Sequence, residues 1–172
     1  MVKPVRMTVS RALLVVLLAL ALAACATGPR YDTAQVDPDL TPQRLAADAP
    51  DHVDQPVVWG GVIVASENLE DRTRLEVLAY PLDRSQRPRT GQPPRGRFLV
   101  EHPGYLETAD YAPGRSLTVQ GQVDEVVDGR IGEAAYRYPR VVPDDLHLWP
   151  RAVEAERTAP RVRFGVGIIL TN

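Results

Sequence analysis

The stretch VVWGGVIVASENLEDRTRLEVLAY, residues 57–80, predicts the fold of this chain. Its first part, residues 57–66, is rich in β-branched side chains, which favour an extended strand. The Gly60-Gly61 pair inside it is typical of a bulge or of a close approach between two backbones. After a short polar turn, residues 72–80 alternate between apolar and charged side chains, as a strand with one solvated face does. We therefore expect an antiparallel hairpin here.

Similar short apolar runs between turn residues follow. Residues 97–102, 115–127 and 130–142 are expected to be strands. Asp128-Gly129 is predicted to be a type I′ hairpin turn, because that turn needs positive φ at both central positions, and residues 143–145 are expected to form a one-turn connector. Six or so strands with few helices predict a mainly β fold, a small antiparallel barrel or sandwich, with an OB-like barrel as the specific expectation.

Upstream of the strands, the chain opens with a basic segment and an unbroken apolar run, residues 12–24. Thirteen residues suit the apolar core of a signal peptide and are too few to span a bilayer. The run ends in the lipobox Leu22-Ala23-Ala24-Cys25, which contains the only cysteine of the chain. We therefore expect residues 1–24 to be a cleaved signal peptide. We expect Cys25 to carry a covalent diacylglycerol group and an N-acyl chain, and no other cofactor.

Two alternatives to lipidation remain open at this point. The leader could be an ordinary secretory signal before a cysteine, or the apolar run could stay attached as a short anchor. Two or more acyl chains would hold the protein stably on a membrane. The next residue is Ala26 rather than aspartate, which favours export to the outer membrane. The expected partners are that membrane, reached through the acyl chains, and the machinery that processes and exports lipoproteins; the oligomeric state stays unknown.

The mature chain divides into three parts. Residues 25–56 are expected to be the lipidated cysteine and a flexible Pro-rich tether, with a short helix at 41–47; residues 57–150 form the β domain. Residues 151–172 are expected to be a linker and a last strand at 161–170. All 22 acidic residues but only 17 of the 20 basic ones follow residue 24, so the mature protein is acidic and no nucleic-acid partner is expected.

No catalytic or metal-binding pattern is evident, so we do not expect an enzyme. The three histidines lie far apart, without the spacing of metal ligands: His52, His102 and His147. The arginine-rich loop at residues 83–96 could contact phosphate, lipopolysaccharide or an acidic partner, or could simply be a solvated loop. Aromatic residues could join this loop in a binding face, or could instead fill the core. The candidate face consists of Trp59, Tyr136, Tyr138, Arg84, Arg87 and Arg89.

Several sequence blocks resemble one known family. They are WGGVI at 59–63, EVLAYPL at 76–82, GEAAYRYP at 132–139 and LHLW at 146–149, and their order and spacing are similar to those of the Slp family of outer-membrane lipoproteins. The resemblance implies a lipoprotein of the Gram-negative outer membrane, in a family named for induction in starvation and stationary phase. It carries over no catalytic residue.

The expected function is therefore that of a non-enzymatic envelope lipoprotein, facing the periplasm, with a structural or stress-related role. The alternatives are a periplasmic-facing binding module for a glycan, lipid or peptide and, last, a hydrolase.

Overall fold

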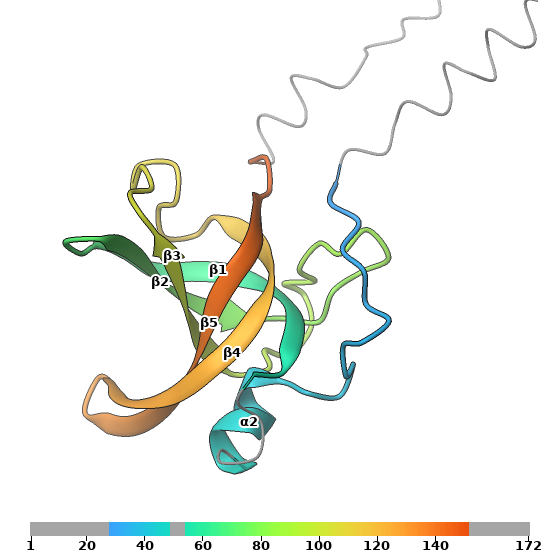
Figure 1. Ribbon diagram of the computed structural model, residues 1–172, viewed down its shortest axis with the longest axis horizontal. Helices are drawn as coiled ribbons and strands as arrows, with labels where there is room; N and C mark the ends of the chain where they lie inside the picture. The colour runs from blue at the N-terminus through green and yellow to red at the C-terminus, as the bar shows by residue number, and fades with distance from the viewer. Residues whose placement is uncertain (1–27, 49–53, 152–172) are drawn as a thin grey trace, which may run out of the picture.

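The computed structural model describes residues 28–48 and 54–151, which form one short helix and five strands (Figure 1). The helix and strands are α2 (Pro42–Asp48), β1 (Pro56–Asn68), β2 (Arg72–Ala79), β3 (Arg97–Pro103), β4 (Ser116–Ile131) and β5 (Ala134–Leu148). The leader, the lipobox with Cys25, and the predicted strand at 161–170 lie outside the described residues. Over the described ranges, no helix is both long and apolar enough to cross a membrane.

The strands close into a barrel in the order β1-β2-β3-β5-β4, which is the Greek-key arrangement of the OB-fold. The prediction of a small OB-like barrel is therefore confirmed, and the sandwich alternative is not what forms. The expectation of a wholly antiparallel sheet is wrong for one pair, since β3 and β5 run parallel. An odd number of strands cannot alternate direction around a closed ring, so a five-stranded barrel must contain a parallel neighbour.

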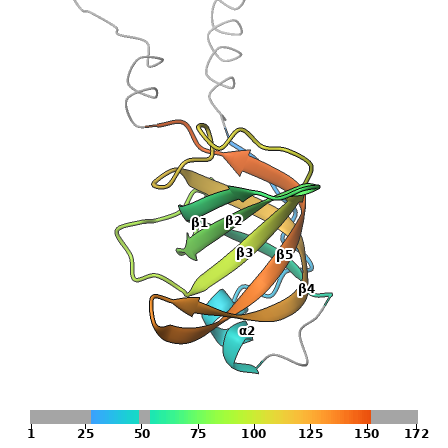
Figure 2. The ribbon, with the colours of Figure 1, turned by 90° about the vertical axis from the view of Figure 1, so that its left-hand side faces the viewer.

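The core fills the barrel with the inward side chains of alternating strand positions. The ring of Trp59 packs edge-on against Phe98, with ring centroids 5.2 Å apart. Helix α2 lies across one end of the barrel (Figures 1 and 2) and buries Leu45 completely. The fully buried strand residues include Val57, Ile63, Leu75, Val77, Phe98, Val100, Leu117, Val119, Val123 and Val141.

The hairpin between β4 and β5 turns later than the sequence predicts. Its two-residue turn is Gly132-Glu133, and only Gly132 has positive φ (+60°), which is the pattern of a type II′ turn rather than type I′. Gly129 instead lies inside β4, opposite Tyr136. A Cβ atom at residue 129 would lie 2.8 Å from the ring of Tyr138, so glycine allows this ring to pack directly on the backbone of β4.

The predicted connector at residues 143–145 is also part of a strand, because β5 continues to Leu148. The β4–β5 register shifts between Gln120 and Gly121, where Gly121 pairs with Pro143. The register skips Asp144, so the bulge lies directly beside Pro143, which cannot donate to the ladder. The strand therefore continues past the proline.

The segment before the barrel differs from the expected flexible tether, because residues 28–48 pack on the domain. The short helix is confirmed as α2. The indole Nε1 of Trp59 donates to the carbonyl oxygen of Leu40 (2.9 Å), and the backbone N–H of Gln43 donates to the carbonyl oxygen of Arg95 (3.0 Å). Leu40 and Leu45 belong to the main apolar core. Within the described residues, the folded unit thus begins at residue 28, well ahead of the boundary expected at residue 57.

Candidate functional site

A groove of about 700 Å³ lies beside the barrel wall. It is bounded by residues 33–42, which lead into α2, by the start of β1, and by the loop at residues 80–95 between β2 and β3. Apolar and charged groups both line it. Among them are Leu40, Trp59, Leu82, Asp39, Arg84 and Arg95.

The loop at residues 80–95 contains most of the exposed basic loop predicted at residues 83–96, and its own hydrogen bonds hold its shape. One carboxylate oxygen of Asp83 accepts the backbone N–H groups of Ser85 (2.8 Å) and Arg87 (3.0 Å). Gln86 between them adopts a left-handed backbone with φ of +62°, which costs free energy for a residue other than glycine. The surrounding contacts must therefore hold Gln86 in place.

A buried polar relay fixes this loop to the barrel. The indole Nε1 of Trp149 donates to the hydroxyl of Thr118 (2.9 Å), and that hydroxyl donates to the carbonyl oxygen of Gln86 (2.6 Å). Thr118 is completely buried. Removal of its hydroxyl would therefore leave the Trp149 N–H and the Gln86 carbonyl oxygen without a hydrogen-bond partner. The strained residue of the loop is thus tied to Thr118 of β4 and, through it, to Trp149 directly after β5.

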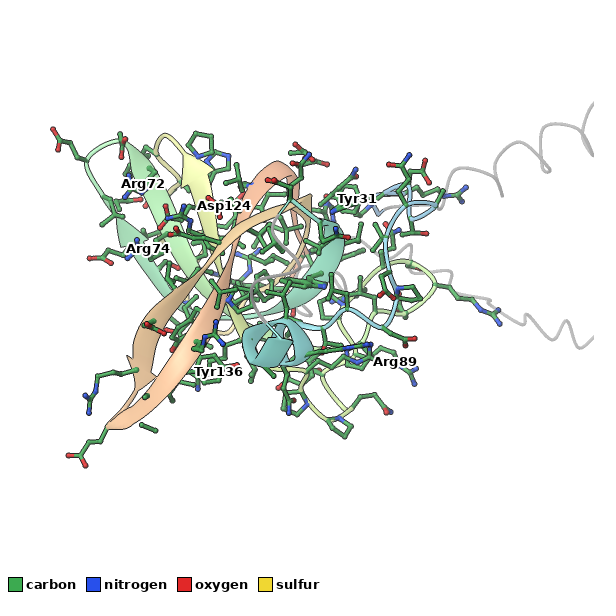
Figure 3. The ribbon with its side chains drawn as sticks, turned by 60° about the horizontal axis from the view of Figure 1, so that its bottom comes forward. Tyr31, Arg72, Arg74, Arg89, Asp124 and Tyr136 are labelled. Carbon is green, nitrogen blue, oxygen red and sulfur yellow. The ribbon has the colours of Figure 1, made fainter. Side chains whose placement is uncertain are left out.

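The same glutamine also holds the N-terminal strap, which we define as residues 28–40. The side-chain amide of Gln86 accepts the N–H of Tyr31 (2.8 Å) and donates to the carbonyl oxygen of Tyr31 (2.9 Å). Gly28 lies against the ring of Trp149, since an added Cβ would be 2.9 Å from its Cη2 atom. Burial, and then the neighbouring Asp145 carboxylate, raise the pKa of the Tyr31 hydroxyl above its ordinary value. Figure 3 shows Tyr31 at the side of the barrel.

We expect Thr118→Val to loosen the loop and the strap together. The change keeps the shape of the side chain but leaves the Trp149 N–H and the Gln86 carbonyl without their partner. An unsatisfied buried polar group costs about 1–3 kcal/mol, so the free energy of unfolding should fall by at least that amount. Urea denaturation followed by tryptophan fluorescence measures the effect. Thr90→Val, at an exposed position of the same loop, is the matched control; equal stability of the two variants would contradict the relay.

The residues of the predicted binding face do not gather in one place. Trp59 and Arg84 both line the groove, although Trp59 is only 7 % exposed. The guanidinium of Arg87 lies over the ring of Trp149, 5.4 Å from its centroid, and Arg89 is exposed (Figure 3). The loop arginines therefore lie beside the groove and Trp149, and they do not form one face with Tyr136 and Tyr138.

Tyr136 and Tyr138 lie elsewhere, on the outer surface of β5. Their rings pack edge-on, 4.7 Å apart. The Tyr136 hydroxyl accepts the backbone N–H of Arg97 (2.8 Å), and the Tyr138 hydroxyl lies 3.1 Å from the carbonyl oxygen of Arg130, to which it donates. Tyr138 is buried, as are Trp59 and Trp149, which agrees with the alternative that the aromatic residues are structural.

A charged cluster bridges the parallel pair of strands on the barrel surface. The Glu101 side chain of β3 is 7 % exposed and lies 2.5 Å from Arg74 and 2.9 Å from Arg72. Arg140 of β5 reaches Asp124 (2.5 Å) and approaches Glu101 (4.0 Å). Figure 3 shows Arg72, Arg74 and Asp124 on this side of the molecule.

Every carboxylate of this cluster is neutralised by arginine, so the cluster braces the barrel and offers no free acid or base. No group of three or more His, Cys, Asp or Glu side chains within residues 28–48 and 54–151 is arranged to hold a metal ion.

Comparison with known proteins adds to this geometry. The sequence matches the Outer membrane lipoprotein Slp family over residues 22–166, a range that begins within the lipobox. It is 37 % identical to a protein named Uncharacterized lipoprotein YeaY of Escherichia coli over 124 residues, which cover 70 % of this chain and 62 % of the relative.

Two further relatives are more distant. A protein of Haemophilus influenzae is 32 % identical over 64 % of this chain and 58 % of its own length. Outer membrane protein Slp of Escherichia coli is 26 % identical over 83 % of this chain and 77 % of its own length. The chain thus spans about three fifths of the length of the first two relatives. The family match extends over most of the sequence, and this chain belongs to the Slp family of outer membrane lipoproteins.

Proposed function

We propose that this protein is anchored in the outer membrane through acyl chains on Cys25 and serves there as a non-enzymatic envelope component. The lipobox at residues 22–25 carries this proposal, because it places a single cysteine directly after a signal-like apolar run. The acyl groups are a diacylglycerol on the thiol and an N-acyl chain on the new amino terminus. Two or more such chains give stable attachment, whereas one gives only marginal binding.

The folded barrel is proposed to face the periplasm and to have a structural or stress-related role. Family membership supports this assignment, and so does the charge cluster around Glu101, in which arginines neutralise the carboxylates. The expected partners are the outer membrane itself and the machinery that acylates, cleaves and exports lipoproteins.

Cys25→Ser is expected to release the protein from the membrane. The wild-type protein should incorporate radioactive palmitate and band with the outer membrane in a density gradient, because its acyl chains partition into lipid. The serine variant should incorporate no label and leave the outer-membrane fraction. Ala26→Asp, which retains Cys25, is the matched control for sorting. It should still be labelled but should move to the inner membrane.

Label that survives in Cys25→Ser would overturn the proposal, as would a wild-type protein that stays soluble. In the second case the groove beside Trp59 would be the place to look for a function. Its volume of about 700 Å³ and its mixed lining favour the alternative of a binding module, to be screened with glycans, lipids and peptides.

A further inference from the structure

The N-terminal strap docks on the barrel very close to the proposed anchor. Gly28 already lies against Trp149, and it is three residues after Cys25. Consecutive Cα atoms are about 3.8 Å apart, so residues 25 and 28 can be separated by at most about 11 Å. An acylated Cys25 must have its Cα atom close to the lipid surface. The contact between Gly28 and Trp149 therefore holds this side of the barrel within about a nanometre of the lipid headgroups.

The strap cannot swing away without breaking specific contacts. A Cβ on Gly28 would meet both the Trp149 ring (2.9 Å) and the carbonyl oxygen of Ser85 (3.5 Å), so the backbone is seated between the loop and the end of β5. Three residues later, the two hydrogen bonds between Gln86 and Tyr31 fix the strap again. Because Gln86 is itself tied to Thr118, the point where the chain leaves the barrel is set by the core.

The surface around this exit point carries exposed arginines. Arg30 belongs to the strap, and Arg84 and Arg87 flank Ser85 in the loop. The loop contributes one carboxylate, Asp83, which accepts two backbone N–H groups, and the strap contributes the exposed Asp32. A guanidinium group presents several donors in a planar fork that suits phosphate oxygens. This patch is therefore chemically matched to the phosphate groups of a lipid leaflet, although the whole mature chain is acidic.

The opposite end of the domain lies away from the proposed anchor. The tip of the β4–β5 hairpin lies far from the point where the described chain begins, as Figures 1 and 2 both show. That end carries the Gly132-Glu133 turn and helix α2. The barrel thus has one end near the anchor and another that must point away from it.

We propose that the acylated protein sits directly on the membrane, with Arg30, Arg84 and Arg87 against the lipid phosphate groups and the β4–β5 hairpin directed away from the leaflet. This inference rests on the proposed lipidation of Cys25. The arginine contacts need not be strong on their own, because the anchor makes them intramolecular and supplies a high effective concentration of lipid. The consequence is a fixed orientation of the barrel on the membrane.

The orientation can be measured with a single fluorescent label at each end. Acylation consumes the thiol of Cys25, so Ser85→Cys or Glu133→Cys supplies the only free thiol in the lipidated protein. Each full-length variant is labelled with a donor dye and reconstituted into vesicles of phosphatidylcholine and phosphatidylglycerol that contain a headgroup-labelled acceptor lipid. We expect efficient energy transfer from residue 85 and loss of most of that transfer at residue 133.

Two changes should reduce this difference. A long Gly-Ser spacer inserted after Ala26 should lower transfer from residue 85 toward the value at residue 133, because it uncouples the barrel from the anchor. The double variant Arg30→Ser/Arg84→Ser should lower it only in part, because the strap contacts at Gly28 and Tyr31 remain, and it leaves Arg87 over the Trp149 ring. Arg130→Ser, at the hairpin end, is the matched control and should leave transfer unchanged.

The outcomes separate the two proposals. Equal transfer from residues 85 and 133 in vesicle-bound protein would overturn the inference and leave the lipid anchor intact. Unchanged transfer in the double variant would overturn the role of the arginines. Protein that carries no acyl group and fails to enter vesicles would overturn the anchor itself.

Discussion

Gly61→Ala is expected to prevent the barrel from closing. Gly61 lies on β1 opposite Ala79 of β2, and a Cβ atom at residue 61 would be 2.1 Å from the carbonyl oxygen of Leu78 and 2.7 Å from its carbonyl carbon. Both are backbone atoms of the neighbouring strand, so the clash can be relieved only by separating β1 from β2. Overpacking in a core costs about 1–3 kcal/mol when side chains can adjust. We expect a larger loss here, because no side-chain movement helps.

Chemical denaturation followed by circular dichroism measures this loss as a fall in the free energy of unfolding. Gly91→Ala is the matched control, since no atom lies within 4 Å of the added Cβ and its backbone is not left-handed. That change should leave stability unchanged or raise it slightly by restricting the unfolded chain. If both alanine variants unfolded at the wild-type denaturant concentration, the close approach of β1 and β2 would be disproved.

The second large effect is expected from Leu45→Ala in helix α2. Leu45 is fully buried at the end of the barrel, and truncation of such a side chain costs about 2–5 kcal/mol through lost burial and the cavity left behind. The helix has seven residues, too few to be stable alone, so its packing holds it in place. Release of α2 should also disturb the hydrogen bond from Trp59 to Leu40, which tryptophan fluorescence would report.

Gln43→Ala provides the matched control for this change. The Gln43 side chain is exposed on the same helix, and alanine is the better helix former. Its free energy of unfolding should stay close to that of the wild type. A Leu45→Ala variant as stable as Gln43→Ala would show that α2 does not close the core.

The strands could be predicted from the sequence because their signals are local. In β2 the inward residues Thr73, Leu75 and Val77 alternate with charged neighbours, and the Gly60-Gly61 pair indicated the close backbone approach that the structure shows at Gly61. The parallel neighbours β3 and β5 could not be predicted in this way. Their pairing follows from barrel closure, which joins residues about forty positions apart, such as Leu99 and Arg140.

The misplaced features have one cause in common, which is that tertiary contacts outweigh local preference. Asp128-Gly129 is a favourable turn sequence, yet Gly129 is used to seat the ring of Tyr138. The proline-rich stretch before β1 suggested a tether, yet its isolated leucines, Leu40 and Leu45, enter the core. These contacts join residues that are apart in the sequence, so no local pattern predicts them.

The candidate site was predictable only in part. The arginine-rich loop was found from its composition, and its arginines are indeed exposed. The groove and the relay through Thr118 were not found, since they join residues from the strap, the loop, β4 and the end of β5. The left-handed backbone of Gln86 also had no sequence signal, because glutamine rarely adopts it.

The short parallel contact between β3 and β5 has a consequence for the order of folding. The β1–β2 and β4–β5 hairpins each join residues close together in the chain, so they can form early at little cost in loop entropy. The β3–β5 contact has only two residue pairs, and it must wait until β3 meets the β4–β5 hairpin, from which residues 104–115 separate it. We therefore expect it to form after both hairpins, and the ion pairs around Glu101 and Arg140 then hold β3 and β5 together.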